Sequence, residues 1–301
     1  MSTRKIVNVA SVPKRSPFRY PGGKTWLVPL ARKWWRSLAR KPSLLIEAFA
    51  GGGIIGLTAA FEGFVDHVVL VEKDPDVSAV WQCICSPDYR ELSNRILHFE
   101  VTEENVKSVL ASDQKEIHDI AFKTILKNRM FHGGIRAPGA SLMKSGENGK
   151  GLKSRWYART LAERIEAIAS LRDRFTVIHN DGIEVLESHS NDKNAIFFID
   201  PPYTAAGKKA GSRLYLHSDL NHAALFDVTS KLSGDFLMTY DNADGVIELA
   251  KLQKFDTEPV AMKNTHHAKM TELLIGRNLG WARQDVSTPR QIEFTFESDT
   301  K

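Results

Sequence analysis

Five segments of the chain are almost continuously apolar, and each ends in glycine or polar residues. They span residues 43–50, 67–74, 174–181, 195–203 and 235–242. Such runs are typical of parallel strands that helices cover on both faces. Segments with a helical pattern alternate with them, at 25–39, 54–62, 76–83, 156–171 and 220–232. The alternation predicts an α/β protein with a doubly wound sheet.

The predicted strands end in residues that suit a ligand site. Gly51, Glu72, Asp181 and Asp200 each stand at the end of a different apolar segment. Open parallel sheets bind their ligands at the carboxyl edge of the strands. Helix capping would explain any single one of these residues, but four at successive strand ends favour a binding site along that edge.

The alternation is interrupted between residues 86 and 171. This stretch is polar and basic, and its centre is the glycine-rich run FHGGIRAPGASLMKSGENGKG, which begins at Phe131. We interpret it as an inserted helical subdomain with a central loop. The main domain then comprises residues 1–85 and 172–301.

The charge is unevenly distributed along the chain. The net charge of the 301 residues is +5, and residues 1–41 carry eleven Lys or Arg and no acid. A second basic stretch, from Lys123 to Arg174, contains Trp156 and Tyr157. Basic clusters of this kind predict a polyanionic partner, in particular a nucleic acid. No apolar run is long enough to span a membrane, and no signal sequence is recognisable, so we expect a cytoplasmic protein.

Two cysteines, Cys83 and Cys85, are separated by one residue. This spacing is too short for an ordinary disulfide, and no other cysteine or tight histidine cluster completes a metal site. We therefore expect two buried free thiols and no bound metal.

Two glycine-rich stretches suggest nucleotide chemistry. Gly22-Gly23-Lys24-Thr25 resembles the end of a phosphate-binding loop, but Phe18 stands where that loop needs a glycine, which argues against a triphosphatase. The stretch AFAGGGIIG satisfies G-x-G-x-x-G from Gly51 to Gly56. Together with an acid at the end of the next strand it indicates an adenosine-containing cofactor, a nicotinamide dinucleotide included.

A sharper signal is Asp200-Pro201-Pro202-Tyr203, which directly follows an apolar strand. The two prolines stiffen the turn and remove two N–H donors. The Asp200 carboxylate and the nearby carbonyls then form a rim of acceptors, which suits an exocyclic amino group. Tyr203 offers a flat face on which a base can stack.

These motifs resemble the Dam-like, D12 class of adenine-N6 DNA methyltransferases in the α arrangement. The resemblance rests on three elements in order: Arg19-Tyr20-Pro21-Gly22-Gly23-Lys24, Phe49-Ala50-Gly51-Gly52-Gly53 and Asp200-Pro201-Pro202-Tyr203. It implies a Rossmann-like, S-adenosylmethionine-dependent fold. It also implies that the insertion 86–171 recognises DNA.

The resemblance assigns roles to individual residues. The catalytic residues would be Asp200, Pro201, Pro202 and Tyr203. Gly51 and Gly53 would lie near the methionine part of the cofactor. Glu72 would bind its ribose, with Asp74 as the alternative residue for this role. Asp181 would lie near its adenine. The cofactor wall would be completed by Tyr20, Gly23, Lys24 and Phe49, with Lys24 meeting the cofactor carboxylate or a nearby acid.

The insertion would contact the DNA. The run from Asn128 to Arg136 resembles the family's N-R-x-x-(F/Y)-N-G-L-x-R. DNA contacts would come from Asn128, Arg129, Phe131, His132 and Arg136. Phe131 would act as a wedge that parts a base step, and Arg136 would read a guanine. His132 replaces the usual Asn, so the sequence that is recognised stays open.

The predicted function is methyl transfer from S-adenosylmethionine to N6 of a flipped-out adenine in double-stranded DNA. Two alternatives change the substrate, to an RNA adenine or to cytosine N4. A third is a module that binds DNA and cofactor without turnover, and a fourth is a nicotinamide oxidoreductase. The sequence leaves open whether a restriction endonuclease partner exists.

Overall fold

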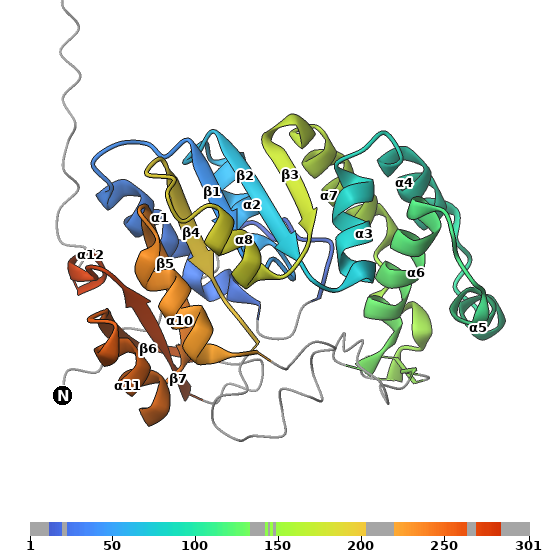
Figure 1. The fold of residues 1–301 in the computed structure, drawn as a ribbon. Helices are drawn as coiled ribbons and strands as arrows, with labels where there is room; N and C mark the ends of the chain where they lie inside the picture. Colours follow the sequence, from blue (N-terminus) through green and yellow to red (C-terminus); the bar gives the residue numbers. More distant parts are fainter. Residues whose placement is uncertain are drawn as a thin grey trace, which may run out of the picture.

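The computed structural model describes residues 12–19, 23–132, 142–143, 145–146, 149–202, 220–263 and 269–283. Its centre is a seven-stranded sheet in the order β3-β2-β1-β4-β5-β7-β6 (Figure 1). The strands are β1 (Leu44–Glu47), β2 (His67–Glu72), β3 (Phe175–His179), β4 (Ala195–Ile199), β5 (Asp235–Asp241), β6 (Asp256–Lys263) and β7 (Lys269–Gly276). The first five run parallel to one another, and β7 runs antiparallel to both β5 and β6.

Helices cover both faces of the sheet, as the near-continuous apolar strands predict. One layer holds η1 (Lys24–Leu27), α1 (Val28–Ser37), α2 (Ile54–Phe61) and α3 (Pro75–Ile84). The other holds α8 (Gly182–Ser188), α10 (His222–Lys231) and α11 (Asp244–Leu252). Successive strand residues face opposite layers: Leu45 belongs to the first core and Ile46 to the second. The order 3-2-1-4-5 makes the fold Rossmann-like.

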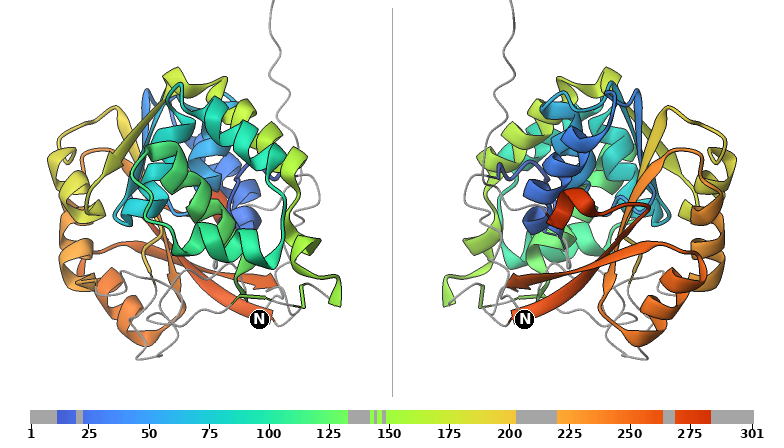
Figure 2. Two further views of the ribbon diagram at one scale, coloured as in Figure 1. Left: turned by 90° about the vertical axis from the view of Figure 1, so that its right-hand side faces the viewer. Right: turned by 90° about the vertical axis from the view of Figure 1, so that its left-hand side faces the viewer.

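The interval between α3 and β3 forms a helical layer beside the sheet (Figure 2). It contains α4 (Tyr89–His98), α5 (Glu103–Ala111), α6 (Ile117–Met130), η4 (Leu152–Arg155), α7 (Ala158–Ala169) and η5 (Arg172–Arg174). In this layer α6 packs on α3, and α4 packs on α7. Its buried side chains, such as Leu92 and Phe122, belong to the same core as α1–α3. The boundaries at 86 and 171 stay a prediction.

The hairpin β6–β7 was not expected from the sequence. Its first strand, DTEPVAMK, is polar and contains Pro259, which cannot donate to a sheet ladder. Because β6 is the edge strand of this sheet, the missing donor is tolerated. The second strand, KMTELLIG, begins with mostly polar residues and has only a short apolar run near its end. Pairing with β5 on one side and β6 on the other stabilises it as a strand.

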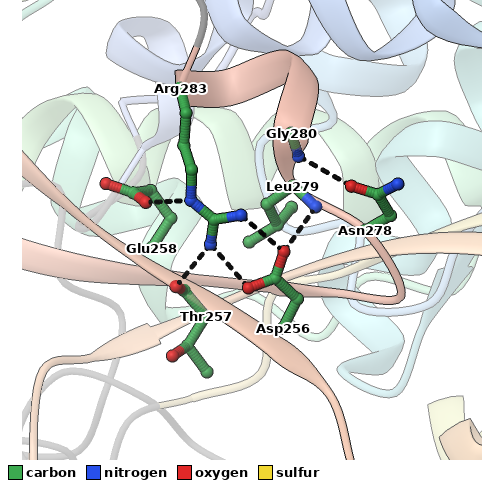
Figure 3. Close-up of polar contacts among 7 residues, drawn as sticks. All are labelled: Asp256, Thr257, Glu258, Asn278, Leu279, Gly280 and Arg283. Atoms are coloured by element: carbon green, nitrogen blue, oxygen red, sulfur yellow. Dashed lines mark hydrogen bonds and ion pairs between the residues drawn. The ribbon is translucent and has the colours of Figure 1, made fainter.

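The last described helix, α12 (Gly280–Arg283), is fastened to this edge strand by polar contacts (Figure 3). Arg283 binds the Asp256 carboxylate through two nitrogens, at 2.8 and 2.5 Å, and Glu258 Oε2 through Nε at 2.8 Å. Asp256 also accepts the backbone N–H of Leu279 at 2.8 Å. One guanidinium thereby pairs with two acids of the edge strand.

Candidate functional site

Four side chains from different elements meet where β4 and β5 end. Lys24 Nζ lies 3.0 Å from Asp200 Oδ1 and 3.6 Å from Glu272 Oε2. Thr239 donates its hydroxyl to the same Asp200 oxygen at 2.7 Å. We call Lys24, Asp200, Thr239 and Glu272 the acid–lysine cluster. Glu272 reaches this edge because β7 is antiparallel, so its early residues lie beside the end of β5, opposite Asp241.

The Lys24 ammonium is almost completely buried, with 4% of the side chain exposed. Burial disfavours its charge, but the carboxylates of Asp200 and Glu272 outweigh burial and hold the pKa of Lys24 above its ordinary value. A buried cation between two acids fixes the position of both. Lys24 therefore orients Asp200, the first residue of the Asp-Pro-Pro motif, against the sheet.

A second buried acid, Glu47, closes β1 in the same neighbourhood. Burial raises its pKa to about 8, and the nearby charge of Asp200 adds to the shift. The backbone N–H of Gly56 donates to Glu47 Oε2 at 2.7 Å, and this hydrogen bond acts in the opposite direction by lowering the pKa. Glu47 is thus mainly protonated at neutral pH, and it ties the end of β1 to the first turn of α2.

The glycine turn between β1 and α2 is clamped to β2 by Glu72. The Gly51 N–H donates to Glu72 Oε2 at 2.9 Å, and the Asp74 N–H donates to Oε1 at 2.9 Å. Trp81 Nε1 donates to the Gly51 carbonyl at 3.1 Å. The turn is therefore held by the Glu72 carboxylate at the Gly51 N–H and by the Trp81 indole at the Gly51 carbonyl.

Gly53 is the N-cap of α2 and has a left-handed backbone, with φ of +62°. A Cβ on this residue would also lie 3.0 Å from the ring of Trp81. Both the backbone and the close approach require glycine here. The third position of G-x-G-x-x-G, Gly56, lets α2 approach β1, since a Cβ there would lie 2.6 Å from Glu47 Oε2.

The two other acids expected at the cofactor site also cap helices. Asp74 accepts the N–H groups of Asp76 and Val77 at the start of α3. Asp181 accepts the Ile183 N–H at 2.8 Å and pairs with Lys73 at 2.7 Å. Burial opposes the charge of Asp181, but Lys73 and the helix N–H groups lower its pKa overall. The half-buried Phe49 lies against Gly182, the residue next to Asp181.

Residues 16–19, which we call the N-terminal strap, connect this edge to the helical layer. Phe18 packs edge-on against Trp81 with ring centroids 5.6 Å apart. The side chain of Asn128 accepts the Arg19 N–H at 2.9 Å and donates to the Arg19 carbonyl at 2.8 Å. Arg129 donates to the Pro17 carbonyl. Asn128 and Arg129, expected as DNA contacts, are instead 1% and 5% exposed and hold the strap.

The remaining expected residues divide into two groups. Tyr20, Tyr203 and Arg136 lie outside the described residues. Of the others, Pro201 is buried and Pro202 half-buried, Phe131 is half-buried with Lys127 Nζ 5.9 Å from its ring centre, and His132 is exposed. Gly23 directly precedes Lys24 as the N-cap of η1. Roles for these residues in binding stay predictions.

Neither cysteine suits nucleophilic chemistry, because burial raises the pKa of Cys83 and of Cys85 to about 12. Across the described ranges, no three His, Cys, Asp or Glu side chains gather in a way that would hold a metal ion. In the same ranges, no helix is both long and apolar enough to cross a membrane.

Sequence reasoning missed Glu47, Thr239 and Glu272. A signal existed for the two acids, since each is the single charged residue within an otherwise apolar strand run, LLIE and TELLI. No comparable signal in the sequence indicated Thr239. Trp81 and Phe18 were missed because an aromatic residue in an apolar pattern reads as ordinary core.

A Rossmann-like sheet with a glycine turn after β1 and an Asp-Pro-Pro turn after β4 defines a methyltransferase of the α/β class. The family model for the D12 class N6 adenine-specific DNA methyltransferases matches residues 20–258, and the chain belongs to that family. No curated protein matches it significantly in sequence.

The solved structures that this chain matches are distant in both sequence and structure. One is a methyltransferase from Geobacter sulfurreducens, at 12% identity and a TM-score of 0.38, covering 86% of this chain and 80% of that one. Another is the rRNA methyltransferase AviRa from Streptomyces viridochromogenes, at 14% identity and a TM-score of 0.34, covering 83% and 84%.

Proposed function

We propose that this chain transfers a methyl group from S-adenosylmethionine to N6 of an adenine flipped out of duplex DNA. The observation that carries the proposal is the acid–lysine cluster. It presents the Asp200 carboxylate, 20% exposed, at the carboxyl edge of the sheet, one strand away from the glycine turn. An acceptor beside a cofactor turn suits a reaction at an exocyclic amino group.

The residues after β1 and β2 fit the proposed cofactor. The glycine turn brings its backbone to the edge without side chains, and Glu72 places carboxylate oxygens beside it, which suit ribose hydroxyls. When bound, S-adenosylmethionine supplies an electrophilic methyl group. Glu72, Gly51 and Gly53 would hold it, with Asp181 and Phe49 from the neighbouring strand ends.

Asp200 would act on the substrate amine. Its carboxylate accepts a hydrogen bond from the N6 amino group, and the Pro201 carbonyl offers a second acceptor. Both hydrogen bonds would leave the nitrogen lone pair free to react with the methyl group. The thioether S-adenosylhomocysteine would then leave, and the surplus proton on N6 would pass to the Asp200 carboxylate or to water. Lys24 and Thr239 hold Asp200 in place beforehand, so that little reorganisation is needed during the reaction.

The adenine must leave the duplex to reach this edge, at a cost of about a few kcal/mol that contacts in the pocket offset. Tyr203 would stack on the base, and Phe131, His132 and Arg136 would contact the DNA. These four assignments rest on the motifs and on the family, whose description names DNA adenine as its substrate.

The test is transfer of tritium from labelled S-adenosylmethionine to unmethylated genomic DNA, followed by nucleoside analysis. We expect label in N6-methyladenine, and a loss of at least about 100-fold in Asp200→Ala. Asp173→Ala is the matched control, because that carboxylate is 93% exposed. Label in RNA adenine or in N4-methylcytosine, with none in N6-methyladenine of DNA, would refute the proposal.

A further inference from the structure

A group of arginines surrounds the N-terminal strap. Arg129 donates to the Pro17 carbonyl of the strap. Arg164 donates to the Ser16 carbonyl at 3.0 Å. Arg19 belongs to the strap itself, and Arg155 closes η4. All three neighbours stand close enough to Arg129 to influence its ionisation. We call Arg19, Arg129, Arg155 and Arg164 the arginine cluster.

Arg129 is a buried cation that has no counter-ion among the described residues. Its side chain is 5% exposed, and among the described residues no carboxylate pairs with it or with Arg164. Its Nε makes no hydrogen bond. Burial, joined by repulsion from Arg164 and Arg19, lowers the pKa of Arg129 to about 10. Buried charges in proteins are normally paired, so this arrangement calls for an external anion.

The outer members of the cluster are partly exposed, although Nε and Nη1 of Arg155 are buried. Arg19, Arg155 and Arg164 are half-buried, Tyr157 beside them is 56% exposed, and Lys153 and Arg159 are exposed around the rim. Arg129 therefore acts as a fixed charge behind a surface that other guanidiniums present. Guanidinium groups grip phosphate with paired hydrogen bonds.

We propose that the arginine cluster binds a backbone phosphate of the nucleic-acid substrate. The inference rests on the proposed function, which makes that substrate duplex DNA. It replaces the expected direct DNA contact of Arg129 by a supporting charge, and it makes Arg155 and Arg164 phosphate contacts that the motifs did not indicate. Because the contact is to the backbone, it strengthens binding to any sequence equally.

The cluster lies next to the residues expected to enter the duplex. Arg129 is two residues from Phe131, and the strap that it holds precedes Gly23 and Lys24 of the acid–lysine cluster by only a few residues in the sequence. A phosphate held here would fix the register of the duplex relative to Asp200. Phosphate contacts commonly position a protein on DNA in this manner.

The test measures the dissociation constant for a fluorescent DNA duplex as a function of salt concentration. Arg155→Gln and Arg164→Gln should each weaken binding about fivefold at low salt and reduce the log–log salt slope by about one. Arg155→Lys keeps the charge and should retain the slope. Arg172→Gln, beyond the far end of α7, is the matched control and should leave affinity and slope unchanged. Arg129 is not used, because its replacement threatens folding.

The outcomes separate this inference from the proposed function. If wild type methylates DNA adenine and the Gln variants keep its affinity and slope, the phosphate site is refuted and the function stands. If wild type methylates only RNA, the proposed function is refuted, and the same salt titration with that RNA tests the phosphate site. A wild type that binds neither nucleic acid refutes both. Equal losses in Arg155→Gln and Arg155→Lys would show a structural role and also overturn the inference.

Discussion

At the scale of single residues, the site depends on buried charges whose partners come from distant parts of the chain. Lys24 and Glu272 are separated by most of the sequence, yet both are almost fully buried beside Asp200. Such a network is costly to break from one side, because the remaining charges stay buried without a partner. Glu47 differs from these groups, because burial keeps its carboxyl protonated and uncharged.

Replacing Lys24 by Met should leave Asp200 and Glu272 as uncompensated like charges. We expect a loss of about 3 kcal/mol in the free energy of unfolding, measured by urea denaturation. Lys41→Met removes a pair whose side chains are 50% and 63% exposed and should leave the free energy of unfolding nearly unchanged. The double variant K24M/E272Q should recover part of the loss. Equal stability of K24M and wild type would contradict the role given to Lys24.

Glu47 makes stability depend on pH with a defined sign. Its pKa is about 8 in the folded protein against an ordinary 4.5, so the folded state holds the extra proton between these values. The stability that this proton contributes is complete below pH 4.5 and is lost as the pH rises to about 8. Compared with Glu47→Gln, wild type should lose about 1.4 kcal/mol per pH unit in that window.

Urea denaturation from pH 5 to pH 9 measures this difference. The exposed Glu248→Gln serves as the control and should run parallel to wild type. If wild type and Glu47→Gln show the same pH slope, Glu47 does not carry the proton.

At the scale of elements, short segments join the parts of the molecule that carry different functions. The strap is fastened to α6 by Asn128, and Phe18 rests on Trp81, which in turn supports the glycine turn. The hairpin β6–β7 brings Glu272 to the catalytic edge, and Arg283 fastens α12 to that hairpin (Figure 3).

Asn128→Leu should test the strap. It removes both hydrogen bonds to Arg19 while keeping a side chain of similar size, so we expect about 2 kcal/mol of lost stability. Under the proposed function, cofactor affinity should also fall, because Phe18 and Trp81 lose their support. Isothermal titration with S-adenosylmethionine measures this effect. Asn105→Leu on α5 removes one exposed hydrogen bond and should change neither value; an unchanged N128L would rule out a supporting role for the strap.

At the scale of the whole molecule, one sheet edge gathers the glycine turn, the acid–lysine cluster and the caps at Asp74 and Asp181. Helices of the inserted interval share a core with α1–α3, so the arginine cluster is attached to the same body as the catalytic edge. Binding of a cofactor at that edge should therefore stabilise the molecule as a unit.

The proposed cofactor predicts a specific thermal shift. At 100 times its dissociation constant, S-adenosylmethionine should add about 2.7 kcal/mol, which raises the melting temperature by roughly 5 °C. Glu72→Gln should reduce this shift. Differential scanning fluorimetry with NADH is the matched comparison and should show none. A shift with NADH alone would favour the nicotinamide alternative over the proposed cofactor.

The family of the protein and the positions of five parallel strands could be predicted from the sequence. Their apolar runs depend on burial on both faces, which is a local signal, and the motifs are contiguous. The hairpin β6–β7 was missed because its strand character comes from pairing with β5, and Pro259 is tolerated only at an edge. The helices α8 and α11 were also not expected, since each is short and stabilised by packing on the sheet.

The sequence by itself determined the α/β alternation, the glycine turn and the Asp-Pro-Pro motif, because each is written in neighbouring residues. Only the tertiary structure decided which charges meet. It paired Lys24 with Glu272 and turned Asn128 and Arg129 inward to the strap. Within the described part of the chain, it left Arg129 without an acid partner. Burial and long-range contact set the energy of a charge, and neither is encoded in the spacing of residues along the chain.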